Sequence, residues 1–168
     1  MTPAFEPMLN EFHEEAAVTK RVLERVPADK LTWKPHPKSM SLGQLALHVA
    51  RIPANLTRLT QLDEFDTSQA SFDPPAPADI QEIHAALEES IRSAGDYLKG
   101  MTEPAAQKSW RLTSKGREVF RKPRIAVVRS IMLNHWYHHR GQLSVYLRLL
   151  EVPVPVIYGR SADENPFA

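Results

Sequence analysis

Four long segments of this chain repeat apolar residues at the spacing of an α-helix, and this pattern constrains the fold more than any other feature. The expected helices cover about residues 3–26, 42–61, 80–99 and 123–151. Each amphipathic helix must bury its apolar face against another element. One long polar crossover, residues 62–78, separates the second helix from the third. The 168 residues therefore predict a single domain, residues 1–168, with an all-α fold, namely a four-helix bundle.

Capping residues mark where the first three helices begin. Thr2 and Pro3 match a cap followed by proline at the first helical position. Ser41 and Gln44 have the spacing of a capping box, in which each side chain bonds the backbone N–H of the other residue. Asp79 begins a second capping signature of the same kind. The local sequence thus supports these three helix starts.

Two shorter segments break the helical pattern. Residues 110–113 and 117–120 alternate between apolar and polar side chains around Lys115 and Gly116, which predicts a small hairpin before the fourth helix. Residues 152–158 are apolar and rich in proline, too apolar for a free tail. We expect this tail to pack on the bundle or on a partner subunit.

The composition limits the partners of the protein and its chemistry. There are 21 Lys and Arg against 20 Asp and Glu, with no basic block, so nucleic-acid binding has little electrostatic support. No apolar run approaches the ~20 residues of a membrane span, and the N-terminus lacks the pattern of a signal peptide. We therefore expect a cytoplasmic protein that binds no nucleic acid and no membrane. Because cysteine is absent, disulfides, thiolate ligands and a cysteine nucleophile are excluded.

Three of the seven histidines, His135, His138 and His139, lie within five residues of the fourth segment. Residues four apart share one face of a helix, so His135 and His139 can direct two imidazoles at one metal ion. His138, three residues after His135, could take the place of His139 as the second ligand. The apolar arc that we place around His135 consists of Val128, Ile131, Met132, Tyr146, Leu149 and Leu150. His139 falls inside this arc and His138 lies on its shoulder, which favours the pair four apart.

A histidine on an apolar face is usually a core residue with a hydrogen-bond partner. Two imidazoles side by side are costly to bury unless something organises them, yet a HxxxH pair is only a partial metal site. His48 lies at the centre of the apolar stripe of the second helix, just before Pro53, which should bend that helix. His84 lies at the edge of the apolar stripe of the third helix and is the main rival to His48 as the third metal ligand. We prefer His48, while His36 and His13 suit exposed positions.

Three nitrogen ligands from two helices would leave one coordination position open, which is typical of a catalytic rather than a structural site. Residues 30–62 and 119–150 contain no Asp or Glu. An ion held there by three imidazoles keeps its +2 charge and favours an anionic fourth ligand, hydroxide or thiolate. Gln142, Asn55 and Gln44 are candidates to orient ligands or water, with helix capping and ordinary buried hydrogen bonding as the alternatives.

Two stretches, residues 39–48 and 135–143, resemble the signatures of the DinB/YfiT-like family, which is unrelated to the DNA polymerase of similar name. The resemblance to this family extends to Trp33 and Pro35 before the second helix and to the tail over residues 158–164. The resemblance covers nearly the whole chain. It implies a metal-dependent four-helix bundle, usually a homodimer.

The resemblance also implies that His48, His135 and His139 bind a divalent ion, with zinc or nickel expected. Some members of the family are thiol S-transferases or isomerases, so we expect a small thiol to bind the ion and attack an electrophilic substrate. The alternatives are a metal-dependent hydrolase and a non-catalytic metal-binding stress-response protein. Gln142, His138 and Tyr146 are the candidates for catalytic assistance.

A second apolar group on the fourth helix points away from the expected metal face. Leu133, Trp136, Tyr137 and Leu147 form this group. Apolar side chains on a solvated face indicate a partner surface, and a symmetric dimer is the commonest solution. The alternative is that the hairpin or the tail covers them within one chain.

Overall fold

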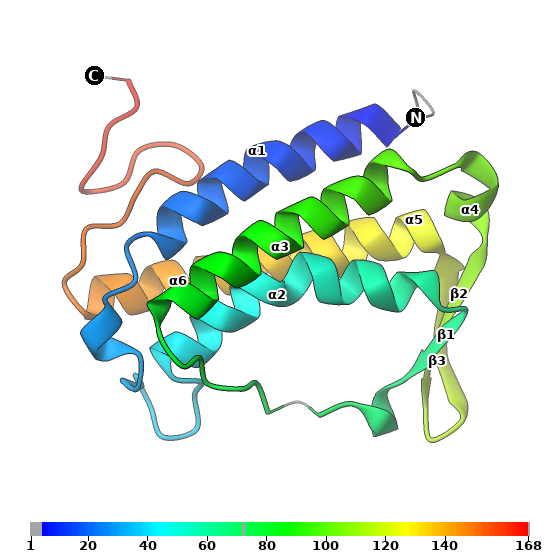
Figure 1. The fold of residues 1–168 in the computed structure, drawn as a ribbon, viewed down its shortest axis with the longest axis horizontal. Helices are drawn as coiled ribbons and strands as arrows, with labels where there is room; N and C mark the ends of the chain where they lie inside the picture. The colour runs from blue at the N-terminus through cyan, green and yellow to red at the C-terminus, as the bar shows by residue number, and fades with distance from the viewer. Residues whose placement is uncertain (1–4, 72, 168) are drawn as a thin grey trace.

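The computed structural model describes residues 5–71 and 73–167 and shows a mostly helical molecule (Figure 1). Its long helices are α1 (Glu6–Leu23), α2 (Leu42–Gln61), α3 (Ile80–Lys99) and α6 (Asn134–Leu149). Helix α1 packs on α3 and α6, and α2 packs on the same two helices, so the four surround one core. The four predicted long helices are therefore present. The cap predicted at Thr2 and Pro3 lies outside the described residues.

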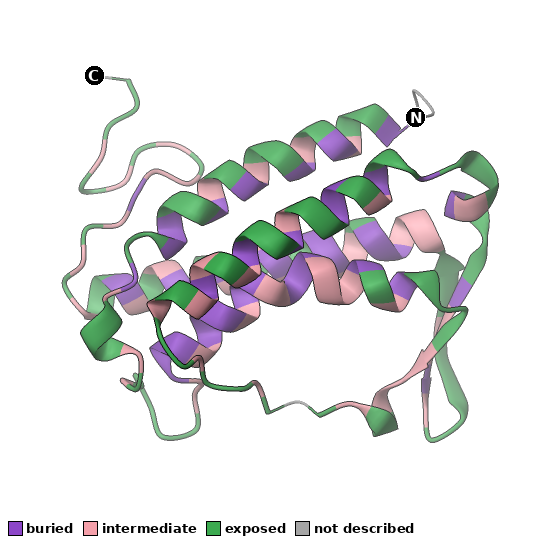
Figure 2. Ribbon diagram, in the orientation of Figure 1, coloured by how far each residue is buried: buried purple, intermediate pink, exposed green. Residues whose placement is uncertain are grey.

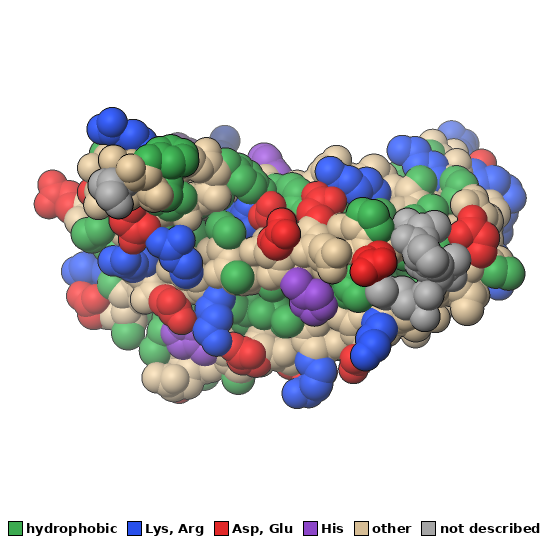
Figure 3. All heavy atoms as spheres, turned by 90° about the horizontal axis from the view of Figure 1, so that it is seen from above, with side chains coloured by type: hydrophobic (Ala, Val, Ile, Leu, Met, Phe, Trp, Pro, Cys, Tyr) green, Lys and Arg blue, Asp and Glu red, His purple; other side chains and the backbone are tan. Residues whose placement is uncertain are grey.

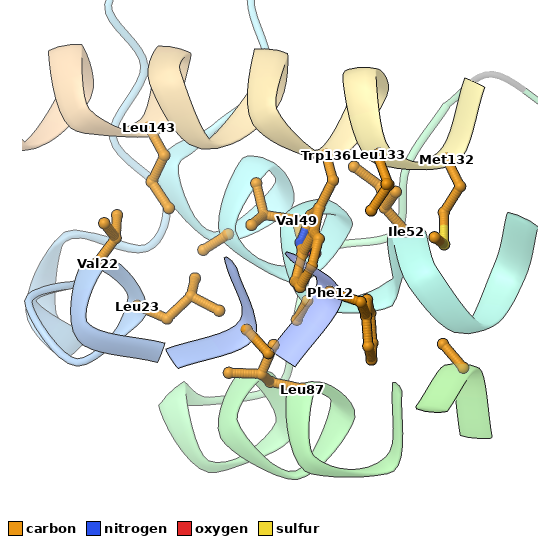
Figure 4. Packing of buried hydrophobic residues seen from close by; sticks show 14 of the residues in the cluster. Phe12, Val22, Leu23, Val49, Ile52, Leu87, Met132, Leu133, Trp136 and Leu143 are labelled. Atoms are coloured by element: carbon orange, nitrogen blue, oxygen red, sulfur yellow. The ribbon is translucent and has the colours of Figure 1, made fainter. Parts of the chain in front are cut away.

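The core fills the space between the facing sides of these helices (Figures 2 and 4). Phe12 of α1, Val49 of α2, Leu87 of α3 and Trp136 of α6 are all buried there. The rings of Phe12 and Trp136 stack with their centroids 5.5 Å apart. Burying each large apolar side chain stabilises the fold by about 1.5–3 kcal/mol. This central packing fixes how α2 and α6 lie against each other.

Two predicted capping motifs are confirmed. In the box at the start of α2, the backbone N–H of Gln44 donates to Ser41 Oγ at 3.2 Å and that of Ser41 donates to Gln44 Oε1 at 2.9 Å. At the start of α3, the backbone N–H of Glu82 donates to the Asp79 carboxylate at 2.9 Å. Both motifs satisfy backbone N–H groups that a helix start leaves without partners.

The predicted fourth helix is continuous from Arg124 to Leu149 but is built in three parts. Helix α5 (Arg124–Val127) leads into a π-helical segment, η4 (Val128–Leu133), and then into α6. Segments of π-helix are rare and are frequent at functional sites. Segment η4 ends two residues before His135.

A three-stranded sheet corrects the all-α prediction. The predicted hairpin is confirmed as β2 (Ser109–Ser114) and β3 (Arg117–Pro123), which pair antiparallel. Lys115 and Gly116 form its turn with φ of 51° and 75°, as a two-residue hairpin turn requires. The unpredicted strand β1 (Glu64–Asp66) lies in the crossover and pairs parallel with β2.

Strand β1 depends on long-range contacts of the crossover, which the local sequence pattern does not predict. The Asp66 carboxylate accepts hydrogen bonds from the backbone N–H groups of Lys115 at 3.0 Å and Gly116 at 2.9 Å. This tie between residues about fifty positions apart fixes a strand too short to show its own alternation. The remaining short elements are the 3₁₀ turns η2 (Ala28–Lys30) and η3 (Thr67–Gln69), and helix α4 (Glu103–Gln107).

The apolar group interpreted as a partner surface is covered within the chain. Leu133, Trp136 and Leu147 are buried, and Tyr137 is half-buried with its hydroxyl donating to Glu11 of α1 at 2.9 Å. These residues are thus covered within one chain, but helices α1 and α2, rather than the predicted hairpin or tail, supply the contacts of Trp136 and Tyr137. The homodimer stays a prediction that these residues no longer support.

The arc assigned to the core side of the fourth helix was only partly right, because Val128 and Met132 are fully buried and Tyr146 and Leu150 pack against the core, but Leu149 does not. The buried face runs through Met132, Leu133, Trp136, Arg140, Leu143 and Leu147. By contrast, Leu149 is 57% exposed, and His135 and His139 are half-buried at the edge of the buried face. Apolar residues occur on nearly every side of this helix, because α1, α2 and the tail all pack on it, so periodicity did not identify one face.

The C-terminal tail packs on its own chain, the first of the two predicted possibilities. Val152, Val154 and Ile157 lie against the core. The Glu164 carboxylate pairs with Arg21 and Arg25 of α1.

On the face in Figure 3, basic and acidic side chains are mixed rather than gathered by sign. None of the described helices is long and apolar enough to cross a membrane.

Candidate metal centre

Pro53 lies inside α2, and its missing N–H leaves the Val49 carbonyl without its helical partner. The indole N–H of Trp136, on α6, donates to this carbonyl at 3.0 Å. The next backbone N–H, that of Ala54, donates to the hydroxyl of Ser90 on α3 at 2.9 Å. Figure 1 shows α2 bent in its middle part, as the sequence predicts. The irregular turn is thus tied to both neighbouring helices by side chains.

Three imidazoles converge beside this turn, between α2 and α6. His48 comes from α2, and His135 and His139 lie one turn apart on α6. One ligand nitrogen of each lies within 4.8 Å of the other two, and the Nε2 atoms of His48 and His135 are 3.1 Å apart. Two nitrogens bound tetrahedrally to one zinc ion at 2.0–2.1 Å are separated by about 3.3 Å. The spacing therefore suits a shared ion.

Gln142 is hydrogen-bonded to one of these imidazoles. Its Oε1 lies 2.7 Å from Nδ1 of His139, three residues earlier on α6. An amide oxygen only accepts, so His139 donates from Nδ1 and keeps the lone pair on Nε2. Such a bond fixes the tautomer and ring orientation of a metal-binding histidine. The contact supports the orienting role expected of Gln142.

Burial favours the neutral form of all three imidazoles. Loss of solvation, with a smaller contribution from His135, lowers the pKa of His48 to about 4. Burial, followed by the neighbouring imidazoles, also lowers the pKa of His139 to about 4. The pKa of His135 is lowered by burial and then by His138. Because a metal binds neutral imidazole, the three nitrogens are available at neutral pH.

The other histidines of the chain lie outside this group. His138 is exposed, with its ring centroid 4.9 Å from that of His139. His84, the expected rival for the third position, is half-buried on α3 and does not belong to the converging group. His13 and His36 are exposed, as predicted.

The remaining candidates already have structural partners. The Tyr146 hydroxyl donates to the Met40 carbonyl at 3.3 Å, and its ring packs edge-on against Trp33 with centroids 5.7 Å apart. Gln44 is engaged in its capping box and donates to the Pro74 carbonyl at 2.8 Å. Capping is therefore the confirmed role of Gln44.

Comparison with known proteins identifies the family of the chain. The family model described as the DinB family matches residues 1–165. The chain belongs to the DinB family. The chain is 26% identical over 166 residues to the uncharacterized protein YrdA of Bacillus subtilis strain 168, covering 98% of this chain and 93% of YrdA. The family expected from the resemblance is thereby confirmed.

Two solved structures share the DinB fold of this chain. A DinB-like protein from Bacillus cereus ATCC 10987 superposes with a TM-score of 0.69 at 21% identity, covering 89% of this chain and 95% of the other. The DinB-like protein YjoA from Bacillus subtilis gives a TM-score of 0.70 at 18% identity, covering 93% and 100%. The overall arrangement of helices is therefore that of DinB-like proteins.

The donor set of this DinB site fits a divalent ion. Among the described residues, the converging group contains only His48, His135 and His139, and no carboxylate joins it. Three nitrogen donors with a further position free are typical of catalytic zinc sites, and imidazole also suits nickel. Because the donors are neutral, an ion held there would attract an anionic ligand.

One feature beside this DinB site was not predicted from the sequence. Arg140, next to His139, is only 1% exposed and pairs with the Glu15 carboxylate of α1. It also donates to Thr19 Oγ1 at 3.1 Å and to the Tyr158 hydroxyl. The only signal in the sequence was an arginine within an apolar helix. The contacts fix α1 and the tail against α6.

Proposed function

We propose that this DinB protein is a metal-dependent enzyme that joins a low-molecular-weight thiol to an electrophilic carbon, using the long helices as a four-helix bundle that holds the ion. The observation that carries the proposal is the convergence of three neutral imidazoles without a carboxylate. An ion with uncompensated charge would supply the stabilisation that lets a thiol lose its proton. The absence of cysteine means that the thiol comes from outside the chain.

The side chains then have distinct roles in the proposed reaction. His48, His135 and His139 bind the ion, and Gln142 orients His139. During transfer, a bond forms between sulfur and the electrophilic carbon, and the bond from that carbon to the leaving group breaks with its electron pair. The thiol proton passes to solvent, because the converging group holds no carboxylate to accept it.

A hydrolase is the second candidate, and the position of His138 favours it. His138 is exposed beside His139, where it could protonate the leaving group of an ester or amide. Tyr146 suits this role less well, because its hydroxyl already donates to the Met40 carbonyl.

The two candidates differ in what binds the ion. Cobalt-substituted protein titrated with a panel of small thiols should develop a sulfur-to-cobalt charge-transfer band if the transferase proposal is right, and His135→Ala should abolish it. Metal-dependent ester hydrolysis without any spectral response to thiols would favour the hydrolase. If neither is observed over broad panels, a non-catalytic metal-binding protein becomes the better description.

A further inference from the structure

A cavity of about 180 Å³ lies between the second half of α2, strands β1 and β2, and the α5–η4 part of the fourth helix. Its principal apolar wall consists of Leu56, Leu59, Phe65, Leu112, Ile131 and Met132. The cavity is therefore formed by the two helices that carry the histidines together with the sheet.

The few polar atoms around this cavity are already hydrogen-bonded. The Trp110 indole N–H donates to the Leu59 carbonyl at 3.1 Å. The hydroxyl of Thr60 donates to the Thr57 carbonyl at 2.8 Å, and that of Thr67 donates to a carbonyl of β2 at 3.2 Å. A ligand in the cavity thus gains little from polar groups, since these donors have partners, and an apolar ligand suits it best.

The cavity lies toward the sheet end of the two helical segments that carry the three histidines. Ile131 precedes His135 by four residues, an axial distance of roughly 6 Å in a helix. Leu56 follows His48 by eight residues on α2, or roughly 12 Å. Both offsets lie toward the sheet end of the helices, so the cavity begins about one turn from the imidazoles. Segment η4 supplies Ile131 and Met132 to the cavity wall and ends two residues before His135.

We propose that this cavity binds the apolar portion of the electrophilic substrate, a single ring of about the size of benzene, while a short spacer presents the reactive carbon to the histidines. A dry cavity of about 150 Å³ accommodates benzene, so this one suits a monocyclic ring. The proposal rests on the proposed function for the reaction at the ion, but the binding of the ring does not require turnover.

Fluorobenzene is the probe for the first experiment, because its binding is observed directly by fluorine NMR in metal-free protein. We expect saturable binding that Leu112→Trp weakens more than tenfold by filling the cavity, about the effect of losing 1.4 kcal/mol of apolar contact. Leu56→Phe is a milder filling change and should weaken binding in the same direction. Leu62→Trp is the matched control, because Leu62 is 53% exposed and does not line the cavity.

Circular dichroism and metal content identify variants that remain folded. The inference is overturned if wild-type protein shows no saturable binding, or if folded Leu112→Trp and Leu56→Phe variants bind the probe as well as Leu62→Trp does.

The second experiment places the ring relative to the ion. Cobalt at the histidines should increase the relaxation rate of bound fluorobenzene relative to zinc, because the ring lies roughly one to two helical turns away. Equal rates in the two proteins would overturn the link between cavity and metal centre. If the ring is relaxed by cobalt while no thiol perturbs the ion, the cavity is supported and the thiol-transferase proposal fails by itself.

Discussion

The indole N–H of Trp136 donates to the carbonyl of Val49, the acceptor that Pro53 leaves without a helical partner. Val49 directly follows one histidine of the converging group and Trp136 directly follows another. The bond therefore joins α2 to α6 one residue beyond His48 and one residue beyond His135. In physical terms, a donor on α6 satisfies the carbonyl that the break in α2 leaves free. This bond fixes the positions of the neighbouring imidazoles of His48 and His135.

This relationship predicts coupling between Trp136 and Pro53. Trp136→Phe removes the donor and should lower the free energy of unfolding by about 1–3 kcal/mol, because the Val49 carbonyl is left buried and unpaired. In a Pro53→Ala background, residue 53 supplies a backbone N–H to the same carbonyl, so the loss should be smaller. Urea denaturation of the four proteins measures the coupling. Equal losses in both backgrounds would contradict this account.

The metal ligands can be tested one histidine at a time. Alanine at His48, His135 or His139 should weaken zinc binding by more than about 100-fold, because changes to residues behind a ligand already cost 10–100-fold. His138→Ala and His84→Ala are controls and should keep the metal. Metal content after purification without chelator, followed by competitive titration, provides the measurement. Full retention in His135→Ala would exclude this site.

Gln142 should act through His139 rather than through the ion. Gln142→Ala should weaken metal binding by about 10–100-fold, because the imidazole loses the acceptor that orients it. Gln142→Glu keeps an acceptor oxygen at this position and should largely restore binding. Zinc titration of the three proteins compares them. A loss in Gln142→Glu as large as in Gln142→Ala would show that orientation is not the role of this residue.

Stability of the metal-free protein should depend on pH through the buried imidazoles. The pKa values of His48 and His139 are lowered from 6.5 to about 4 in the folded protein. The unfolded chain therefore binds more protons between these values, and the free energy of unfolding should fall as pH decreases from about 6.5 toward 4. Denaturation at pH 7 and pH 5 measures the slope. The double variant His48→Gln, His139→Gln should flatten it, whereas His36→Gln should not.

The buried ion pair between Arg140 of α6 and Glu15 of α1 should contribute strongly to stability. Glu15→Ala leaves the Arg140 guanidinium buried without its counter-charge, which should cost about 3–5 kcal/mol. Glu14→Ala, at the exposed neighbouring position, should change stability by less than about 0.5 kcal/mol. Thermal and urea unfolding compare the two variants. Similar small effects in both would mean that the pair contributes little.

Local sequence patterns identified the elements whose conformation depends on near neighbours. Ser41 with Gln44, Asp79, and Lys115 with Gly116 each determine a cap or turn through residues at most three positions away. The four-residue spacing of His135 and His139 likewise follows from helix geometry alone, as does their common face.

Only the tertiary structure decided which distant groups meet. Strand β1 exists because Asp66 and its neighbours pair with residues about fifty positions later. The core side of the fourth helix was ambiguous because apolar residues surround it, and Arg140 became a core residue only through Glu15 on α1.

The sequence by itself therefore determined the helices, the hairpin and the histidine pair on α6, because periodicity and capping act within a few residues. Bringing His48 of α2 to that pair, and excluding His84, required the packing of whole helices. The physical reason is that a metal centre is defined by distances of a few ångströms between elements. Those distances follow from long-range contacts such as that of Trp136 with Val49, which no local pattern encodes.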